Sequence, residues 1–521
     1  MTNPSTLYRG GVLHCPADPS ATALLVSDGR IAWLGTDGDA PPADRVVDLD
    51  GALVTPAFVD AHVHATDTGL ALSGLELSGV RSAGQLLDAV AGFAAGLPAD
   101  AVVLGHGWDE SGWSDATLPD AAALDRVAGG RRVYLSQASI HSALVSSALL
   151  AACPQAAQAA GYDASGWLRR DAHHVVRAAA QGSVTRAQRV AAQRVALAHA
   201  ASLGIAAVHE CGGPEISDEE DFTGLLGISG AGVPEVYGYW GELGGAARAR
   251  ELGAVGAGGD LFADGALGSR TAHVSQPYGD GDGCGHGYLS AEQVRDHLLD
   301  CAAQGLQGGF HAIGDAAIDT VLDGFAAAAA TLGVERLRAA RHRIEHAEIM
   351  NKRMIARFVE YGIVASMQPA FDRLWGGAGR MYEARLGLDR SLESNPMGAM
   401  HSVGVALAFG SDSPVTPLDP WGSVRAAAAH HNPAQRMSVR SAFAAHTRGG
   451  WRAVHLDVEG VLALGAPATF AVWSTPAGVE RGLPVLVAED PEVRGPDDPT
   501  PLPVCRRLVL RGEVIYEEGS S

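Results

Sequence analysis

The sequence predicts an α/β protein built on a closed (β/α)8 barrel of the TIM type. A composite β-sandwich from both chain termini and a long insertion after the first barrel strand complete the predicted fold. Two observations lead to the barrel: eight short apolar runs recur along the chain, and helical stretches separate many of them. Alternation of strands and helices is typical of a parallel sheet, and eight such units are enough to close one into a barrel.

The barrel is expected over residues 53–456, with the insertion at about 67–200. Its first strand is the run 53–64, in which β-branched and apolar residues predominate. The other seven strands are predicted at 205–208, 234–239, 260–263, 308–310, 342–345, 363–367 and 405–409. Helical periodicity marks 187–202, 291–303, 316–332 and 350–361. Within the insertion, 102–106 and 132–135 have the composition of strands.

The β-sandwich is expected from residues 1–52 together with 457–521. Asp28-Gly29 separates two apolar runs near the start of the chain, and Arg511-Gly512 does the same near its end. A short turn of this kind between apolar runs indicates a β-hairpin. Neither terminus offers enough strands for a stable sheet alone, so both should contribute to one domain.

Composition and charge restrict the classes of function. The 521 residues are 47% hydrophobic and carry a net charge of -21, which argues against a nucleic-acid partner. Six scattered cysteines form no CxxC pair, so buried free thiols are expected. No basic segment precedes an apolar run at the start, and the alanine-rich stretches are interrupted before membrane-spanning length. We therefore expect a cytoplasmic protein that acts on a small molecule without contacting a membrane; a homo-oligomer is compatible with the sequence.

Histidines and an aspartate follow the predicted strands. His62 and His64 are two residues apart on the first strand, so both side chains point to one face. Alone, this pair is more often hydrogen-bonded or half-exposed than metal-binding. His311, His346 and Asp412, however, follow strands five, six and eight, and the C-terminal ends of barrel strands share one rim. Imidazole and carboxylate without thiolate suit zinc, and also manganese, iron or nickel. The sequence thus predicts a divalent metal, with zinc as the first choice.

The same segments carry a family resemblance. PAFVDAHVH, FHAIGDAAID, RIEHAE, SMQPAF and FGSDSPV, in this order, resemble the amidohydrolase superfamily. FADGALGSRTA narrows the resemblance to the YtcJ-like branch, amidohydrolase family 3, which includes N-substituted formamide deformylases. The resemblance covers most of the chain and implies a metal-dependent (β/α)8 barrel with a β-sandwich from both termini.

One position departs from the family pattern. The family usually has a lysine on strand four whose carboxylated side chain bridges two metals, but here that position is Asp260. The only lysine, Lys352, follows strand six. We expect one tightly held metal bound by His62, His64, His311 and Asp412. His346 would then be a ligand to a second ion or a donor to the substrate carbonyl.

Two alternatives remain for Asp260: a shortened bridging ligand, or a carboxylate held by a neighbouring arginine. Glu210, after strand two, could also supply a carboxylate, although a supporting or helix-capping role is favoured.

Together with the predicted metal site, the resemblance implies hydrolysis of a C–N bond, in an amide or N-formyl group, by a metal-activated water. Asp412 would act as general base and then general acid, and His346 would help to stabilise the oxyanion. Two alternatives stay open. One is a metal-dependent decarboxylase or isomerase on the same barrel, and the other is a non-catalytic binding or regulatory protein.

Further residues match positions that line the pocket in similar proteins. They are Trp108, Asp109, His141 and Arg270. Each has a structural alternative; Trp108 could be core, and Arg270 could pair with Asp264.

Three other features are assigned supporting or surface roles. Asp315 and Glu345 are expected to orient loops or ligand histidines. His430-His431 lies in a polar segment and is interpreted as a surface pair.

Overall fold

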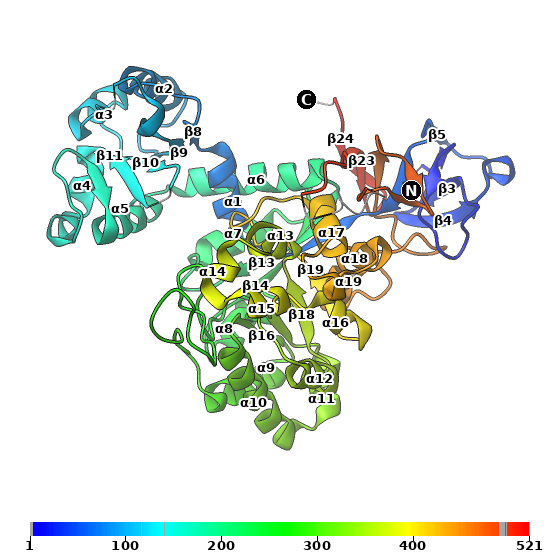
Figure 1. Cartoon of the computed structure of the whole chain (residues 1–521). Helices are drawn as coiled ribbons and strands as arrows, with labels where there is room; N and C mark the ends of the chain where they lie inside the picture. The colour runs from blue at the N-terminus through cyan, green and yellow to red at the C-terminus, as the bar shows by residue number, and fades with distance from the viewer. Residues whose placement is uncertain (1–3, 116, 140, 489–494, 496, 520–521) are drawn as a thin grey trace. The chain divides into compact units, whose positions relative to one another are not determined.

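The computed structural model describes residues 4–115, 117–139, 141–488, 495 and 497–519 (Figure 1). It divides into two compact units. The first comprises Met1–Ala65 and Leu197–Ser521, and the second is Thr66–Ala196.

The first unit contains an eight-stranded parallel sheet, which confirms the predicted barrel. Its strands in spatial order are β7 (Phe58–Val63), β13 (Ile205–Gly212), β14 (Glu235–Trp240), β15 (Gly256–Ala257), β16 (Gln307–Ala312), β17 (Arg343–His346), β18 (Val364–Met367) and β19 (Ala406–Phe409). The two edge strands meet through hydrogen bonds from the Asp412 amide to the His62 carbonyl (2.8 Å) and from the His64 amide to the Ser413 carbonyl (2.9 Å). Most strand residues are buried, as expected for a parallel sheet covered by helices.

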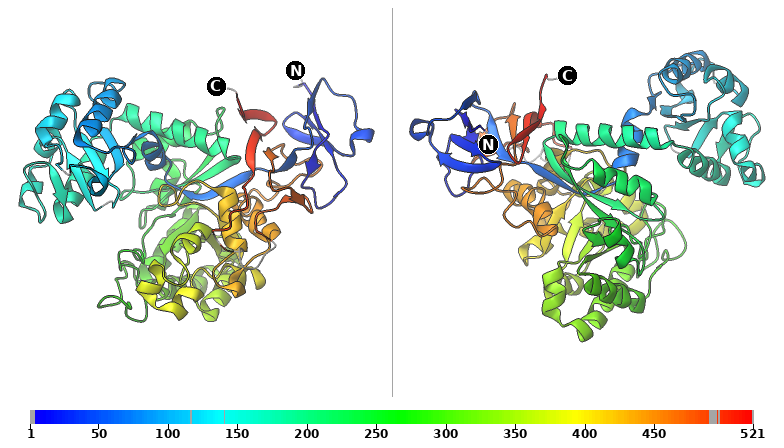
Figure 2. Two further views of the ribbon diagram at one scale, coloured as in Figure 1. Left: turned by 45° about the horizontal axis from the view of Figure 1, so that its top comes forward. Right: turned by 180° about the vertical axis from the view of Figure 1, so that it is seen from behind.

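Helices surround these strands (Figure 2). Those that lie wholly in the first unit are α7 (Glu219–Gly227), α8 (Ala246–Glu251), α9 (Ala291–Gln304), α10 (Asp315–Leu332), α11 (Val334–Ala340), α12 (Lys352–Tyr361), α13 (Pro369–Trp375), α14 (Met381–Leu386), α15 (Leu388–Glu393), α16 (Met397–Ser402), α17 (Pro420–Ala428), α18 (Val439–Ala445) and α19 (Arg448–Ala453). The helix α6 (Arg186–Ser202) begins in the second unit and ends in the first. Among the described residues, no single helix is long and apolar enough to cross a membrane; α10 and α11, which meet at 116°, reach that length and composition only as a bent pair.

Two strand predictions are wrong in their limits. The run 53–64 forms two strands that are divided at Ala57. β6 (Leu53–Pro56) pairs with the sandwich strand β20 (Phe470–Ser474), whereas the next amide, that of Phe58, donates to the Gly204 carbonyl (2.9 Å), so only β7 belongs to the barrel. Strand four lies before the predicted 260–263, at β15. Gly258 and Gly259 have φ angles of 144° and 76°, which end the strand, so Asp260 follows it in a loop.

The β-sandwich has two sheets built from both termini. One sheet contains β1 (Thr6–Arg9), β3 (Ala23–Ser27), β4 (Arg30–Gly35) and β5 (Arg45–Asp48); the other contains β2 (Val12–Leu13), β6, β20, β23 (Val504–Leu510) and β24 (Glu513–Glu517). Tyr8, Leu24, Phe470 and Val509 pack in their shared core. Asp28-Gly29 and Arg511-Gly512 both have positive φ angles at the two turn positions, as a type I′ hairpin requires.

The second unit has a sheet and a core of its own. The sheet contains β8 (Leu75–Glu76), β9 (Val103–Trp108), β10 (Val133–Gln137), β11 (Ser142–Val145) and β12 (Trp167–Arg169). Its helices are α1 (Ala65–Ser73), α2 (Ala83–Ala95), α3 (Ala121–Val127), α4 (Ser147–Ala152) and α5 (Arg170–Gln181). Separate clusters around Leu86 and Leu149 show that the insertion is a small α/β unit.

Candidate metal centre

Six polar side chains meet at the C-terminal ends of the barrel strands. His62 and His64 come from the end of β7, His311 from β16 and His346 from the end of β17. Asp260 and Asp412 each lie three residues beyond a strand, after β15 and β19. All except His64 are at least nine-tenths buried. The structure therefore brings together these six residues, all of which the sequence analysis proposed as candidate metal ligands.

The carboxylate of Asp260 lies between two pairs of histidines. Its Oδ2 atom is 3.5 Å from His62 Nε2 and 3.2 Å from His64 Nε2, and its Oδ1 atom is 3.3 Å from His311 Nδ1 and 3.9 Å from His346 Nε2. These contacts are all with histidines, so the interpretation of Asp260 as an arginine-held carboxylate is wrong.

Asp412 completes the group around the first pair. Its Oδ1 atom is 3.5 Å from His62 Nε2 and 3.2 Å from His64 Nε2. Oxygens of two carboxylates thus approach the same two imidazole nitrogens. Ligand atoms from His62, His64 and Asp412, and from His62, Asp260 and His346, lie close enough together to share an ion.

A close approach of two backbones explains how an aspartate reaches this position. A Cβ atom on Gly258 would lie 2.3 Å from the Gly309 amide nitrogen, and one on Gly309 would lie 2.7 Å from that of Gly259. Side chains at these positions would force β15 and β16 apart. The glycines let the segment before Asp260 pack directly against the strand that carries His311.

The electrostatic environment favours positive charge. Burial alone lowers the pKa of His64, but Asp260 and Asp412 raise it well above its ordinary value. Burial alone would raise the pKa of Asp260, yet His62, His311 and His346 hold it well below the usual range. His62 Nε2 is buried without a hydrogen-bond partner in the described structure, although two carboxylates lie near it. A buried nitrogen of this kind, beside anionic oxygens, fits a divalent cation.

Hydrogen bonds outside this group orient two of its histidines. His62 Nδ1 lies 2.9 Å from Glu345 Oε2, and His346 Nδ1 lies 2.8 Å from Gln368 Oε1. Glu345 in turn accepts hydrogen bonds from the fully buried Arg343. A proton on each Nδ1 leaves the Nε2 lone pair facing the centre, as a metal ligand requires.

The backbone is strained at the same place. His346, Ala347 and Asp412 have φ angles of 69°, 48° and 58°, a region that non-glycine residues rarely adopt. Such conformations persist where the surrounding structure fixes them, and they concentrate at functional sites. At Asp412 this conformation accompanies the hydrogen bond of its amide to the His62 carbonyl, which joins the two ends of the barrel sheet.

Sequence analysis did not identify Arg343 or Gln368, although both lie in the quoted motifs RIEHAE and SMQPAF. Arg343 is two residues before Glu345, so both side chains point to the same face of β17. This spacing was a signal for a buried ion pair. Gln368, which directly follows β18, had the same strand-end position as the predicted ligands.

The residues proposed to line the pocket have other contacts in the structure. Trp108 is fully buried in the core of the second unit and donates its indole N–H to the Leu135 carbonyl (2.8 Å), so it is a core residue and its proposed substrate contact is wrong. Asp109 caps the short helix that follows it, and His141 is exposed. Arg270 pairs with Asp280 at 3.0 Å, not with Asp264.

The supporting roles were predicted correctly. Glu210 accepts a hydrogen bond from the amide of Ala65, the first residue of α1, and so caps that helix (2.8 Å). Asp315 accepts one from the Ser275 amide (2.7 Å) and fixes that loop.

The surface interpretation of His430-His431 is wrong. His430 is fully buried, 3.3 Å from Asp372, and His431 lies 3.1 Å from the same carboxylate. The polar sequence around this pair concealed the fact that α13 supplies a buried acidic partner.

Comparison with known proteins agrees with this geometry. A model of the amidohydrolase family matches residues 45–516. The putative amidohydrolase YtcJ of Bacillus subtilis is 25% identical over 98% of this chain and 99% of its own length. The protein LONG AFTER FAR-RED 3 of Arabidopsis thaliana is 35% identical over 41% of this chain and 38% of its own.

A solved structure has the same fold. An uncharacterised metal-dependent hydrolase from Pyrococcus furiosus superimposes with a TM-score of 0.75 at 24% identity, over 90% of this chain and 98% of that one. The match to the family model across most of the sequence, together with the barrel and its rim of histidines and aspartates, shows that this chain belongs to the amidohydrolase family.

Proposed function

We propose that this protein hydrolyses a C–N bond, in an amide or N-formyl group of a small molecule, with a divalent metal held at the barrel rim. The observation that carries the proposal is the convergence of four histidines and two aspartates at one end of the barrel strands, with the His62 Nε2 atom buried among them and without a hydrogen-bond partner within the described residues. Family membership supports a hydrolase, and the donor set supports a divalent ion, with zinc as the first choice.

We further propose that Asp260 takes the place of the family's lysine and would help to hold two ions. Its Oδ2 atom faces His62 and His64, whereas its Oδ1 atom faces His311 and His346. Each oxygen can therefore serve a different ion. This arrangement favours the bridging alternative over a single ion bound by His62, His64, His311 and Asp412.

When bound, the metal supplies Lewis acidity, which activates water and polarises a carbonyl. His62, His64, His311 and His346 hold the site, and Gln368 keeps the Nε2 lone pair of His346 facing it. His346 is therefore better suited to be a ligand than a proton donor. Asp412, which is 7% exposed, accepts the proton of the attacking water and transfers it to the leaving amine.

The test combines a metal count with a panel of amide and N-formyl substrates on the same preparation. Asp412→Asn should remove turnover and leave the folded structure intact, because the amide cannot accept the proton. Asp319→Asn, which removes a partly exposed partner of Arg353, is the matched control and should keep wild-type turnover.

Released amine and acid in equal amounts would support hydrolysis. Turnover that releases no amine would instead indicate decarboxylation or isomerisation. Wild-type rates in Asp412→Asn would remove this residue from the mechanism.

A further inference from the structure

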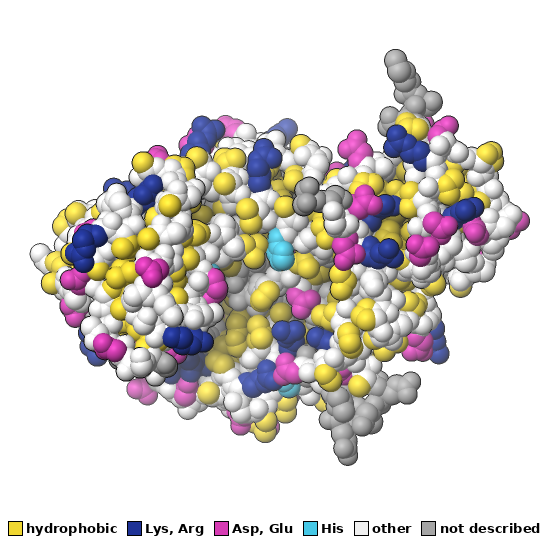
Figure 3. All heavy atoms as spheres, turned by 90° about the horizontal axis from the view of Figure 1, so that it is seen from above, with side chains coloured by type: hydrophobic (Ala, Val, Ile, Leu, Met, Phe, Trp, Pro, Cys, Tyr) yellow, Lys and Arg dark blue, Asp and Glu magenta, His cyan; other side chains and the backbone are white. Residues whose placement is uncertain are grey.

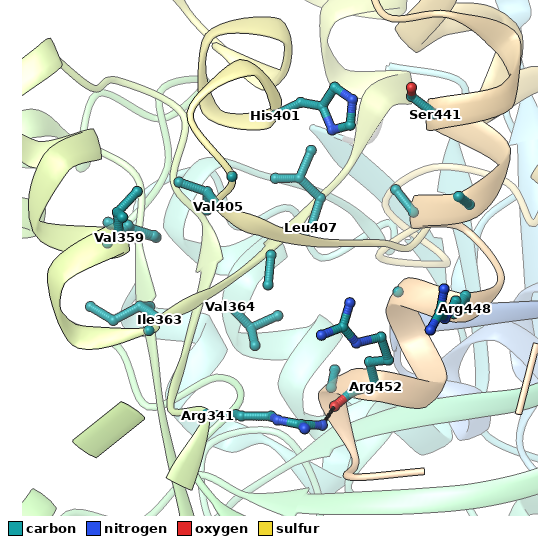
Figure 4. Close-up of a pocket in the computed structure, with 18 of the residues that line it drawn as sticks. Arg341, Val359, Ile363, Val364, His401, Val405, Leu407, Ser441, Arg448 and Arg452 are labelled. Atoms are coloured by element: carbon teal, nitrogen blue, oxygen red, sulfur yellow. Dashed lines mark hydrogen bonds between the residues drawn. The ribbon is translucent and has the colours of Figure 1, made fainter. Parts of the chain in front are cut away.

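The residues drawn in Figure 4 line a cavity of about 590 Å³, which lies at the other end of the barrel strands from the metal centre. It is next to Val364 and Ala406, the first residues of β18 and β19. In contrast, His346 is the last residue of β17 and Asp412 follows the C-terminal end of β19, two parallel strands of the same sheet. The cavity is therefore separate from the proposed active site.

Basic side chains dominate the charged lining of this cavity. The lining includes Arg338, Arg341, Arg440, Arg448, Arg452 and His401. Within the described part of the chain it contains no aspartate or glutamate. This concentration is unusual in a protein with a net charge of -21. On the face drawn in Figure 3, basic and acidic side chains are interspersed.

Nearby groups satisfy only part of this positive charge. Asp457 is shared by Arg341, at 2.7 Å, and Arg452, at 3.4 Å. Arg338 donates to the backbone carbonyls of residues 359 and 360. Arg440 and Arg448 have no carboxylate within ion-pair distance among the residues that the structure describes. The cavity thus has positive charge that is not neutralised by these residues.

The arginines surround an apolar region. Val364, Val405 and Leu407 line the cavity and are buried, and Figure 4 shows the Arg452 side chain extending towards Val364. Arg341 approaches from the opposite side and donates to the Arg452 carbonyl (2.7 Å). Guanidinium groups bind carboxylate and phosphate through two parallel hydrogen bonds. The volume falls in the range of small-molecule pockets, roughly 300–1,000 Å³.

We propose that this cavity binds a small organic anion that carries at least two carboxylate or phosphate groups. Arg440 and Arg448 would bind acidic groups, while the apolar residues contact the carbon framework of the ligand. The proposal is independent of the reaction at the metal centre.

Binding of defined probes by isothermal titration calorimetry tests this site. Trimesate represents a polycarboxylate, fructose 1,6-bisphosphate represents a polyphosphate, and neutral 1,3,5-tris(hydroxymethyl)benzene controls for the apolar contribution. The metal-loaded protein should bind at least one anion at one site per chain, and the affinity should fall as salt rises. The anion that binds more tightly shows whether the cavity prefers carboxylate or phosphate groups.

Substitution of the cavity arginines tests whether the anions bind at this site. Arg440→Gln with Arg448→Gln should weaken binding of the anion about 10-fold or more, because each substitution removes a charged hydrogen-bond donor from the cavity. Arg295→Gln is the matched control, since this arginine is outside the cavity and pairs with Asp296. If the melting temperature of the double variant differs from that of the wild type, Arg448→Gln alone is measured in its place. Absence of binding by both anions at millimolar concentration, or equal binding by the arginine variants and wild type, would overturn the proposal.

Discussion

Glu345→Gln tests whether the buried ion pair behind the metal centre supports it. Glu345 is fully buried, accepts a hydrogen bond from Arg343 at 2.8 Å and lies 2.9 Å from His62 Nδ1. Burial alone would raise the pKa of Glu345, but Arg343 and His62 lower it to about 2. The substitution retains the shape of the side chain and removes its charge. Arg343 is then left buried without its carboxylate.

Two effects of this change can be measured. Removing one partner of a buried ion pair costs roughly 3–5 kcal/mol of unfolding free energy. Losing the carboxylate that orients a ligand histidine weakens metal binding about 10–100-fold. Urea unfolding reports the first effect and competition with a chelator reports the second.

Asp319→Asn is again the matched control, because Asp319 is partly exposed and pairs with Arg353 and Arg357 of α12, outside the metal centre. It should change stability by at most about 1 kcal/mol and leave metal affinity unaltered. If Glu345→Gln behaved like this control in both assays, the proposed support of His62 by Glu345 would be refuted.

Two further predictions concern buried polar groups in the barrel. Burial lowers the pKa of His342 from 6.5 to about 3. The contribution of its neutral form to the free energy of unfolding is therefore complete above pH 6.5 and is lost as the pH falls towards 3, because the unfolded chain is protonated over this range while the folded chain is not. His342→Asn, which keeps an acceptor for the Gly308 amide, should lose less stability over this range in urea titrations at several pH values. Asp264 accepts hydrogen bonds from the amides of residues 273, 313 and 314. Asp264→Asn should lower the free energy of unfolding by about 1–3 kcal/mol, because its single amide oxygen cannot satisfy all three donors. An unchanged melting temperature would contradict this role.

The barrel could be predicted because its strands and helices alternate in the sequence. Strand four was placed too late because Gly258 and Gly259 end it, and the apolar residues that follow are in a loop. The run 53–64 contained too little local information to show that a sandwich strand ends and a barrel strand begins at Ala57. That division depends on pairing with β20, more than 400 residues further along the chain.

The candidate site could be predicted as a set of residues but not as a geometry. Parallel strands place His62, His311 and His346 on one rim whatever the details of their contacts. Which oxygen of Asp260 faces which histidine depends on how closely β15 approaches β16, and that distance is set by glycine contacts between segments about 50 residues apart. Local sequence does not specify such an approach.

Metal content per chain tests the central claim most directly. Wild-type protein and Asp260→Asn, each stripped with a chelator and reconstituted with zinc, would be measured by elemental analysis after removal of free metal. The bridging arrangement predicts two ions per wild-type chain and a clear loss in Asp260→Asn, because one amide oxygen cannot join two cations. One ion in both proteins would contradict the bridge, and a wild-type chain that binds no divalent metal would contradict the metal centre itself.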